Sequence, residues 1–197
     1  MMCDDYVVFD IETTGLNKDN DYIIEIGALK YKNNILVDEF NYLINPKIKL
    51  PEIITTITGI KDEDLINQDT IDNVLPKFID FIEDLPLIAH NNEFDLGFIN
   101  KNIKDLNLNK LNNKMIDTLA LARIYLPQMY NYKLETLKKY FNIKQVSHRA
   151  IGDCYTTNYV YQECKKRAAV KNQKSLFVWI GFYSTSTVSN HFSNFGK

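Results

Sequence analysis

The order of hydrophobic patterns along the chain most constrains its fold. Residues 6–11, 22–32 and 35–44 are rich in β-branched and aromatic side chains, and polar turn sequences, "TTGLNKDND" and Asn33-Asn34, separate them. We therefore expect three consecutive strands in a meander. From Asp69 onward, patterns with helical spacing alternate with short apolar runs. Strands followed by alternating helices and strands predict an α/β domain with a mixed sheet flanked by helices.

The later elements follow from periodicity and cap signals. Apolar residues between 71 and 82 fall at helical spacing behind an Asp69-Thr70 cap, with Pro76 one turn in, where it could kink the helix. We expect strands at "PLIAH" and "MID", and helices from about residue 92, over 119–125 and 134–141, and finally over 149–167. Residues 1–170 are then one domain, and residues 171–197 are a tail of unknown role.

Composition restricts the class of protein. The 197 residues are enough for one domain with a substantial core, and three cysteines without CxxC spacing indicate neither a disulfide framework nor a zinc site. This cysteine usage favours a reducing, cytoplasmic location. No targeting segment and no apolar run of membrane-spanning length is visible, so no membrane partner is expected.

Charge is divided unevenly between the two halves of the chain. Residues 1–98 contain 7 Lys and Arg against 20 Asp and Glu, whereas residues 99–197 contain 16 against 5. An acidic half suits cations and a basic half suits phosphates, as in metal-assisted chemistry on nucleic acid. The alternative is that the charges of both halves only cover solvated surface. Charge alone favours this simpler interpretation.

Two carboxylates stand at the end of an otherwise apolar strand. In "VVFDIETTGLN", Asp10 and Glu12 are two residues apart and so share one face of the strand, which Thr13-Thr14-Gly15 then terminates. Carboxylates this close repel each other, and a divalent cation would relieve the repulsion. A rim pair bound to Lys or Arg is the alternative, and it is the commoner meaning of an isolated D-x-E.

Further acidic residues change this balance. Asp95 in "HNNEFDLGF" falls in the first turns of a helix that follows a strand. His148 and Asp153 in "SHRAIGDCYTT" flank a junction between a loop and a helix, so they could converge on one cleft. Each of these motifs alone occurs often by chance. Their occurrence by chance in the order D-x-E, then D, then H-x-x-x-x-D is much rarer.

These motifs identify a family resemblance. "VVFDIETTGLN", "IIEIGALK", "ITGI", "HNNEFDLGFI" and "HRAIGDCYTT" occur in the order in which the DEDDh family of 3′–5′ exonucleases carries them. The chain most resembles the epsilon-subunit type, the proofreading exonuclease of bacterial DNA polymerase III, over about residues 6–168. His148 stands where the sister branch carries tyrosine.

The resemblance implies a ribonuclease H-like fold and a two-metal hydrolase. Two divalent cations, Mg²⁺ or Mn²⁺, would be held by Asp10, Glu12, Asp95 and Asp153, because hard cations prefer oxygen ligands. His148 would accept the proton of the attacking water. The implied substrate is a single-stranded or frayed DNA 3′ end, and the implied product is nucleoside 5′-monophosphate.

Substrate contacts are also implied by the resemblance. The predicted substrate residues are Thr13, Thr14, Gly15, Leu16, Ile57, Thr58, His90, Asn91 and Phe94. Packing in the core explains Phe94 and Ile57 equally well. Lys133, Lys138, Lys139, Lys144 and Arg149 could guide phosphates, although a solvated helix face explains the lysines as well.

The tail contains one further motif. Gln173, Leu176 and Phe177 in "QKSLF" resemble the short peptide with which bacterial replication proteins bind the sliding clamp, which implies the clamp and a replicative DNA polymerase as partners. A five-residue match is weak, and an apolar strand or helix docked on the domain is the favoured interpretation.

The sequence leaves other functions open. An exoribonuclease of the same fold that trims RNA is one, because the metal centre tolerates either sugar. A binding module without catalysis is another, although the intact set of acidic residues and His148 opposes it. A polymerase-accessory role with secondary nuclease activity is the third.

Overall fold

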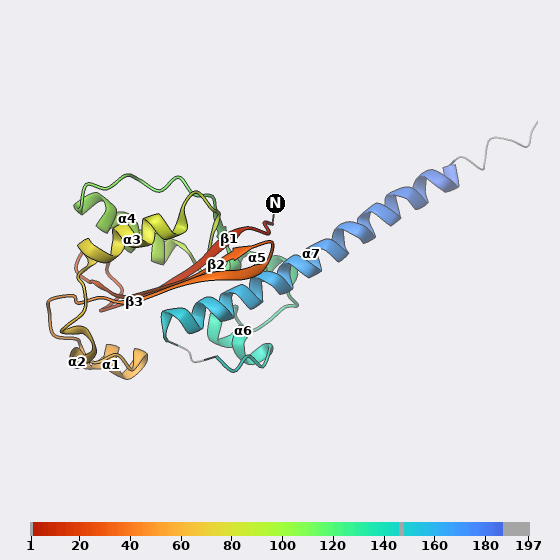
Figure 1. Cartoon of the computed structure of the whole chain (residues 1–197). Helices are drawn as coiled ribbons and strands as arrows, with labels where there is room; N and C mark the ends of the chain where they lie inside the picture. The colour runs from red at the N-terminus through yellow and green to blue at the C-terminus, as the bar shows by residue number, and fades with distance from the viewer. Residues whose placement is uncertain (1, 146–147, 187–197) are drawn as a thin grey trace, which may run out of the picture.

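A five-stranded mixed sheet forms the centre of the computed structural model (Figure 1). The structure describes residues 2–145 and 148–186, with side chains as far as residue 171. The strands are β1 (Tyr6–Thr13), β2 (Ile23–Lys32), β3 (Ile35–Leu43), β4 (Leu87–Ala89) and β5 (Met115–Asp117), in the spatial order β3-β2-β1-β4-β5. The first three strands pair antiparallel, and β4 and β5 join in parallel. The predicted meander and the mixed sheet are confirmed.

Seven helices are present among the described residues. They are α1 (Glu52–Thr58), α2 (Asp62–Leu65), α3 (Ile71–Ile82), α4 (Glu93–Asp105), α5 (Thr118–Tyr125), α6 (Leu134–Tyr140) and α7 (Ala150–Ser186). Helices α3 and α4 cover one face of the sheet, and α7 crosses the other face (Figure 1).

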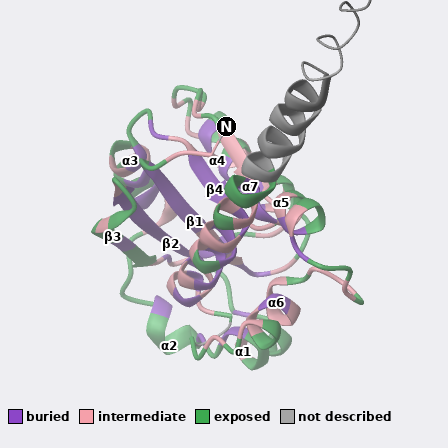
Figure 2. Ribbon diagram, turned by 90° about the vertical axis from the view of Figure 1, so that its right-hand side faces the viewer, coloured by how far each residue is buried: buried purple, intermediate pink, exposed green. Residues whose placement is uncertain are grey.

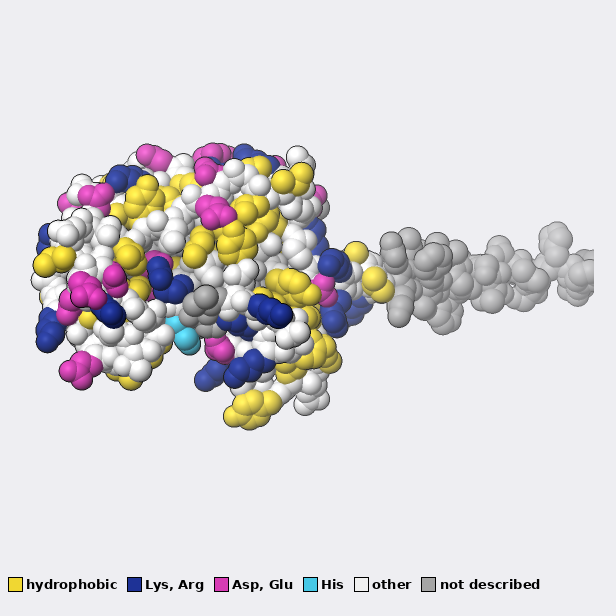
Figure 3. Space-filling view, turned by 60° about the horizontal axis from the view of Figure 1, so that its bottom comes forward, with side chains coloured by type: hydrophobic (Ala, Val, Ile, Leu, Met, Phe, Trp, Pro, Cys, Tyr) yellow, Lys and Arg dark blue, Asp and Glu magenta, His cyan; other side chains and the backbone are white. Residues whose placement is uncertain are grey.

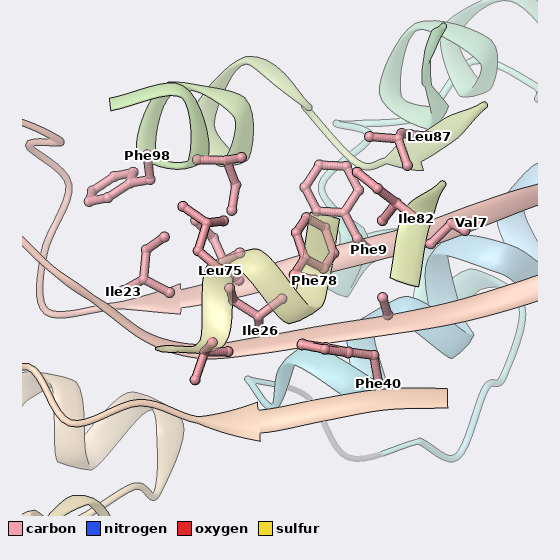
Figure 4. Close-up of a cluster of buried hydrophobic side chains, with 14 of the residues drawn as sticks. Val7, Phe9, Ile23, Ile26, Phe40, Leu75, Phe78, Ile82, Leu87 and Phe98 are labelled. Carbon is pink, nitrogen blue, oxygen red and sulfur yellow. The ribbon is translucent and has the colours of Figure 1, made fainter. Parts of the chain in front are cut away.

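Apolar residues dominate the face beneath α3 and α4, where the buried Lys30 of β2, opposite Val7, is a charged exception. Alternate residues of β1, namely Val7, Phe9 and Ile11, point to this face. They pack with Phe78 of α3 and Phe98 of α4, and the ring centroids of Phe9 and Phe78 are 5.8 Å apart (Figure 4). Aromatic contacts of this kind give the larger of the two cores on the sheet.

The other face of the sheet begins apolar and ends polar. Tyr6 and Val8 pack under Tyr161 of α7, with the Tyr6 and Tyr161 rings edge to face at 5.0 Å. The next two residues of β1 on this face are Asp10 and Glu12. Helices α5 and α6 extend this layer by packing on α7, and the buried residues lie between the helices and the sheet (Figure 2).

Several boundaries differ from the expectations. Helix α7 begins near the predicted residue 149 but continues past 167 to Ser186, through a stretch with no proline and a single glycine, Gly181. The short helices α1 and α2 were not predicted. Leu65 of α2 and Ile60 between the two helices pack with Ile24 of β2, in a cluster too small to give a clear helical period.

Two details of α3 also differ. Thr70 is the N-cap residue, but its hydroxyl contacts Asp72 and accepts no bond from the helix backbone, so the predicted cap is wrong in its chemistry. Pro76 lies inside the helix, which nevertheless runs unbroken from Ile71 to Ile82. The apolar face around Phe78 holds the helix on the sheet across the proline.

Candidate active site

The end of β1 presents two carboxylates to the face covered by α7. Burial, followed by the negative charges of Asp95, Asp153, Glu12 and Glu25, raises the pKa of Asp10 well above its ordinary value. Burial and the charges of Asp153 and Glu25 raise the pKa of Glu12 to about 8. A register shift between Glu12 and Thr13 ends the regular pairing of β1 here, which is where bulges commonly re-aim side chains near active sites.

Asp95 reaches the same place from α4. Its side chain is 4% exposed, and its Oδ1 accepts a hydrogen bond of 3.2 Å from the backbone N–H of Ile11. Burial raises the pKa of Asp95 to about 7, although backbone hydrogen bonds oppose the shift. The bond to Ile11 fixes this carboxylate beside the strand that carries Asp10.

The start of α7 contributes Asp153 and His148. The backbone N–H of His148 donates to Asp153 Oδ2 at 3.0 Å, which ties the loop to the helix. His148 has φ of 58°, a left-handed conformation that is uncommon for residues other than glycine. Ligating atoms of Glu12, His148 and Asp153 lie within 4.8 Å of one another. The predicted convergence of β1 with the H-x-x-x-x-D motif is therefore present.

The electrostatics of this cluster fit a cation. Burial raises the pKa of Asp153, as it does for Asp10, Glu12 and Asp95. Carboxylates held together in this way gain protons or a divalent ion, and oxygen donors suit Mg²⁺ or Mn²⁺. The donor set of this chain thus fits a divalent metal centre.

The turn after β1 is stabilised from within. Thr13 Oγ1 donates to the Gly15 carbonyl at 2.6 Å, and Thr14 Oγ1 accepts from the backbone N–H of Tyr22 at 3.0 Å. A Cβ on Gly15 would lie 2.5 Å from the Asp21 carboxylate, so a larger residue here would displace that side chain. Leu16, by contrast, is 87% exposed. The turn holds its two threonines inward and presents Leu16 outward.

An open groove of about 580 Å³ adjoins this turn. Leu16 and Lys18 line one side, and Asn91, Phe94 and Gly97 line the other. The Phe94 ring also stacks at a tilt on Phe98, 5.1 Å away. The sequence is compatible with Phe94 either as a substrate contact or as a core residue. Its position fits both, because its side chain packs on the core and also lines the groove.

The side chains of other predicted substrate residues form hydrogen bonds within the protein. The His90 ring bonds to Thr118 Oγ1 at 2.9 Å and to the Tyr132 carbonyl at 2.8 Å, so both of its nitrogens face the protein. Thr58 is buried, and its hydroxyl bonds to the Ile54 carbonyl within α1. The side chains of His90 and Thr58 thus have structural partners, whereas Ile57 is 46% exposed on α1.

A notch separates two lobes beside the site (Figure 3). Acidic side chains gather over α1 and α2, Lys and Arg gather over α6, and a histidine lies between the lobes. His148 Nε2 is 4.0 Å from Glu135 Oε1 of α6. Arg149 was considered as a residue that guides phosphates, but its guanidinium binds Glu25 at 3.0 Å in this structure.

Sequence reasoning missed two carboxylates near the site. Glu25 of β2 is fully buried, and Asp117 caps α5 while its Oδ1 accepts from the backbone N–H of Asn91 at 2.9 Å. The glutamate inside the apolar run "IIEIGALK" is the signal that could have identified Glu25.

The side chains of Gln173, Leu176 and Phe177 lie outside the described residues, so the clamp motif stays a prediction. Across the described part of the chain, no helix combines the length and apolarity that a bilayer crossing requires.

Comparisons with known proteins agree on one family. The family model described as "Exonuclease" matches residues 7–161. The PolC-type DNA polymerase III of Clostridium perfringens is 41% identical over 178 residues, which are 88% of this chain and 12% of that protein. The Bacillus cereus PolC-type enzyme is 44% identical over 156 residues, 79% of this chain and 11% of that protein. The chain spans about a tenth of the length of these relatives.

Solved structures show the same fold. Exonuclease X in complex with 5′-overhanging duplex DNA has a TM-score of 0.65 at 23% identity, covering 82% of this chain and 91% of that one. A structure of exonuclease I has a TM-score of 0.75 at 17% identity, covering 92% of this chain and 44% of that one. A zinc-bound form of that enzyme with single-stranded DNA, at 17% identity and covering 88% and 43%, has a TM-score of 0.72. The expected ribonuclease H-like fold is confirmed, and this chain belongs to the exonuclease family.

Proposed function

We propose that this chain is a metal-dependent 3′–5′ exonuclease that removes nucleotides from single-stranded or frayed DNA 3′ ends and releases nucleoside 5′-monophosphates. The observation that carries the proposal is the convergence of carboxylates from β1, α4 and α7, with raised pKa values, beside an exposed histidine. Membership of the exonuclease family supports the reaction class.

Asp10, Glu12, Asp95 and Asp153 would hold two divalent cations, Mg²⁺ or Mn²⁺. When bound, the cations supply Lewis acidity at the phosphate and lower the pKa of the attacking water. The protein contributes the geometry, because the backbone N–H of Ile11 fixes the Asp95 carboxylate and the backbone N–H of His148 fixes the Asp153 carboxylate.

His148 would accept the proton of the attacking water. Its side chain is exposed at the rim of the carboxylate cluster, within 4.8 Å of ligating atoms of Glu12 and Asp153. An imidazole changes charge near neutral pH and so can act as a general base there.

The groove between Leu16 and Phe94 would receive the terminal nucleotide. The exposed Leu16 on one wall and the half-buried Phe94 on the other provide apolar surface on which a base can stack. The turn over Thr13, Thr14, Gly15 and Leu16, together with Asn91, would contact the terminal sugar and phosphate. These contacts would use groups other than the backbone N–H groups of Thr14 and Asn91, which already bond to the Tyr22 carbonyl and to Asp117.

Residues 1–170 would form the exonuclease domain, and residues 171–197 a segment with a separate role. The PolC-type relatives are polymerases of which this chain matches about a tenth. This supports proofreading in replication, with a replicative DNA polymerase as partner and the clamp motif at Gln173, Leu176 and Phe177 as a second contact.

The test is digestion of matched 5′-labelled DNA and RNA single strands with Mg²⁺ or Mn²⁺. We expect a DNA ladder that shortens from the 3′ end, is abolished by EDTA, and slows by about 10²–10⁴-fold in His148→Ala. Asp153→Asn should lose Mn²⁺ binding as well as activity, whereas His148→Ala should keep most Mn²⁺ binding. Shortening that persists in EDTA would refute the metal centre, and cleavage of RNA alone would replace the DNA substrate with RNA.

A further inference from the structure

Strand β2 lies alongside the two carboxylates of β1. In the antiparallel register, Gly27 is opposite Asp10 and Glu25 is opposite Glu12. Residues directly opposite each other in an antiparallel pair share one face of the sheet, with Cβ atoms about 5 Å apart. Glu25 and Gly27 therefore face α7 together with the two candidate metal ligands.

Glu25 binds the beginning of α7. The carboxylate is fully buried, and its Oε1 and Oε2 accept hydrogen bonds of 3.3 and 3.2 Å from Arg149 Nε. Arg149 Nη2 donates to Oε1 at 3.0 Å, and the backbone N–H of Ala150 donates to Oε2 at 3.1 Å. A buried anion thus satisfies both an arginine fork and the N-terminus of a long helix.

Gly27 allows the helix to approach the strand closely. A Cβ at this position would lie 2.6 Å from both the carbonyl carbon of Ala150 and the backbone nitrogen of Ile151. Neither atom is the end of a flexible side chain, so any larger residue would displace the first turn of α7. Cys154 Sγ contacts the Gly27 carbonyl at 3.3 Å, one turn further along the helix.

We infer that Glu25 and Gly27 are positioning residues that set the distance between the β1 carboxylates and the third acidic motif, an inference that rests on the proposed function. Asp153 lies one helical turn beyond Arg149, to whose carbonyl its backbone N–H donates at 3.0 Å, and His148 immediately precedes Arg149. A shift of the helix start would therefore move Asp153 and His148 together. Metal ligands tolerate little displacement, so the effect would be greatest on metal binding.

The test compares Glu25→Gln with Glu39→Gln. Glu39 also accepts from α7, through the Tyr155 hydroxyl, but on the exposed surface and away from the helix start. Mn²⁺ affinity is measured by titration of the full chain, and kcat and KM are measured on 5′-labelled single-stranded DNA over a range of Mn²⁺ concentrations.

For Glu25→Gln we expect Mn²⁺ affinity to fall by about 10–100-fold, the range found when groups that orient metal ligands are changed. The kcat at low Mn²⁺ should fall similarly, should recover in part at high Mn²⁺, and should leave the KM for DNA unchanged. Glu39→Gln should match the unmodified protein in all three quantities.

Arg149→Lys and Gly27→Ala are two further substitutions that should displace the start of α7. Circular dichroism shows whether each variant folds. If Glu25→Gln does not fold, Arg149→Lys decides, because its partly exposed side chain keeps a positive charge but loses the fork. Unchanged Mn²⁺ affinity in the folded variants would overturn the inference, as would lost activity that high Mn²⁺ does not restore. An unmodified protein that binds Mn²⁺ but degrades neither DNA nor RNA would refute the proposed function alone, and Mn²⁺ affinity would still test the positioning.

Discussion

The two faces of the sheet use the same strands for opposite purposes. On the side of α3 and α4, β1 contributes Val7, Phe9 and Ile11 to a core of hydrophobic side chains, beside which Lys30 of β2 is already paired with Glu83. On the side of α7, the alternate residues of β1 end in Asp10 and Glu12, whose pKa values are raised by burial and by other carboxylates. The first face stabilises the fold mainly by apolar packing, whereas the second holds charges whose repulsion disfavours it.

This difference indicates how stability and function are separated in the molecule. The apolar face needs no ligand to be stable, because its side chains are buried against one another. The carboxylate cluster is complete only when protons or cations balance it. Substitutions on the two faces should therefore have opposite effects on stability and on activity.

Asp10→Asn should have the largest effect on activity. Removing one ligand charge is expected to lower kcat by about 10³-fold, equivalent to about 4 kcal/mol of transition-state stabilisation. The same change relieves repulsion from Glu12 and Asp95, so the metal-free protein should unfold at an equal or higher temperature at pH 8. Single-turnover digestion and thermal unfolding in EDTA measure the two quantities. A clear fall in the unfolding temperature would show that Asp10 stabilises the fold.

Phe78→Ala should give the converse result. The Phe78 side chain is fully buried between Phe9 and Phe40, and truncating such a residue costs about 3–5 kcal/mol of unfolding free energy. The kcat of the folded variant, measured well below its unfolding temperature, should stay within about twofold of the unmodified value. Urea denaturation and digestion kinetics provide the comparison. A large loss of kcat in folded protein would show that the two faces are coupled.

Sequence reasoning performed differently on the two faces as well. Runs of β-branched and aromatic residues between turn sequences predicted β1 to β3, of which β1 and β2 are buried on both faces, and helical spacing with cap signals predicted α3 to α6. The D-x-E pair was recognised because its carboxylates end an otherwise apolar strand, and the H-x-x-x-x-D junction was recognised from its order after D-x-E and Asp95 and from the family resemblance. The lengths of α1, α2 and α7 were not predictable, since little local periodicity marks them.

The roles of Glu25 and Arg149 could not be read from the sequence for another reason. Their contact joins residues 124 positions apart, and it depends on the register of β1 against β2. The same holds for His90, whose partners Thr118 and Tyr132 come from later segments. Motifs indicated which residues could react, but only the packed structure shows which of them are already bonded.

The stability of the metal-free protein should fall as pH rises from about 6.5 to 8.5. The pKa values of Glu12 and Asp95 are raised to about 8 and about 7, above their unfolded values of 4.5 and 3.8. In this window the folded state binds more protons than the unfolded state, so the free energy of unfolding decreases with pH. Burial lowers the pKa of His90, an effect of opposite sign that is confined to pH values below about 6.5.

Thermal unfolding in EDTA and in Mg²⁺ measures this effect. Each kcal/mol corresponds to about 2–4 °C for a chain of this size, and we expect a drop of at least that amount in EDTA. Mg²⁺ at pH 8.5 should reverse the drop, because the cation replaces the protons. Glu12→Gln should flatten the dependence in EDTA, and a metal-free stability that rises with pH would contradict the assigned direction.

The smallest predicted effect concerns one hydroxyl on the α7 side. Thr157 Oγ1 is buried and finds no hydrogen-bond partner within the described part of the protein. The neighbouring Thr156, equally buried, donates to the Gly152 carbonyl at 3.1 Å. Thr157→Val removes an unsatisfied polar group and should stabilise the protein by about 1 kcal/mol, whereas Thr156→Val removes a formed bond and should not stabilise it.

Both variants keep the branched shape of threonine, so packing changes little between them. The difference in unfolding temperature should be about 3 °C or more in favour of Thr157→Val, with exonuclease activity unchanged. Equal effects of the two substitutions would indicate that a buried water satisfies Thr157. The described side chains of α7 would then include no unsatisfied hydroxyl, so the unfavourable burial of polar groups that they share with the sheet would come from the carboxylates.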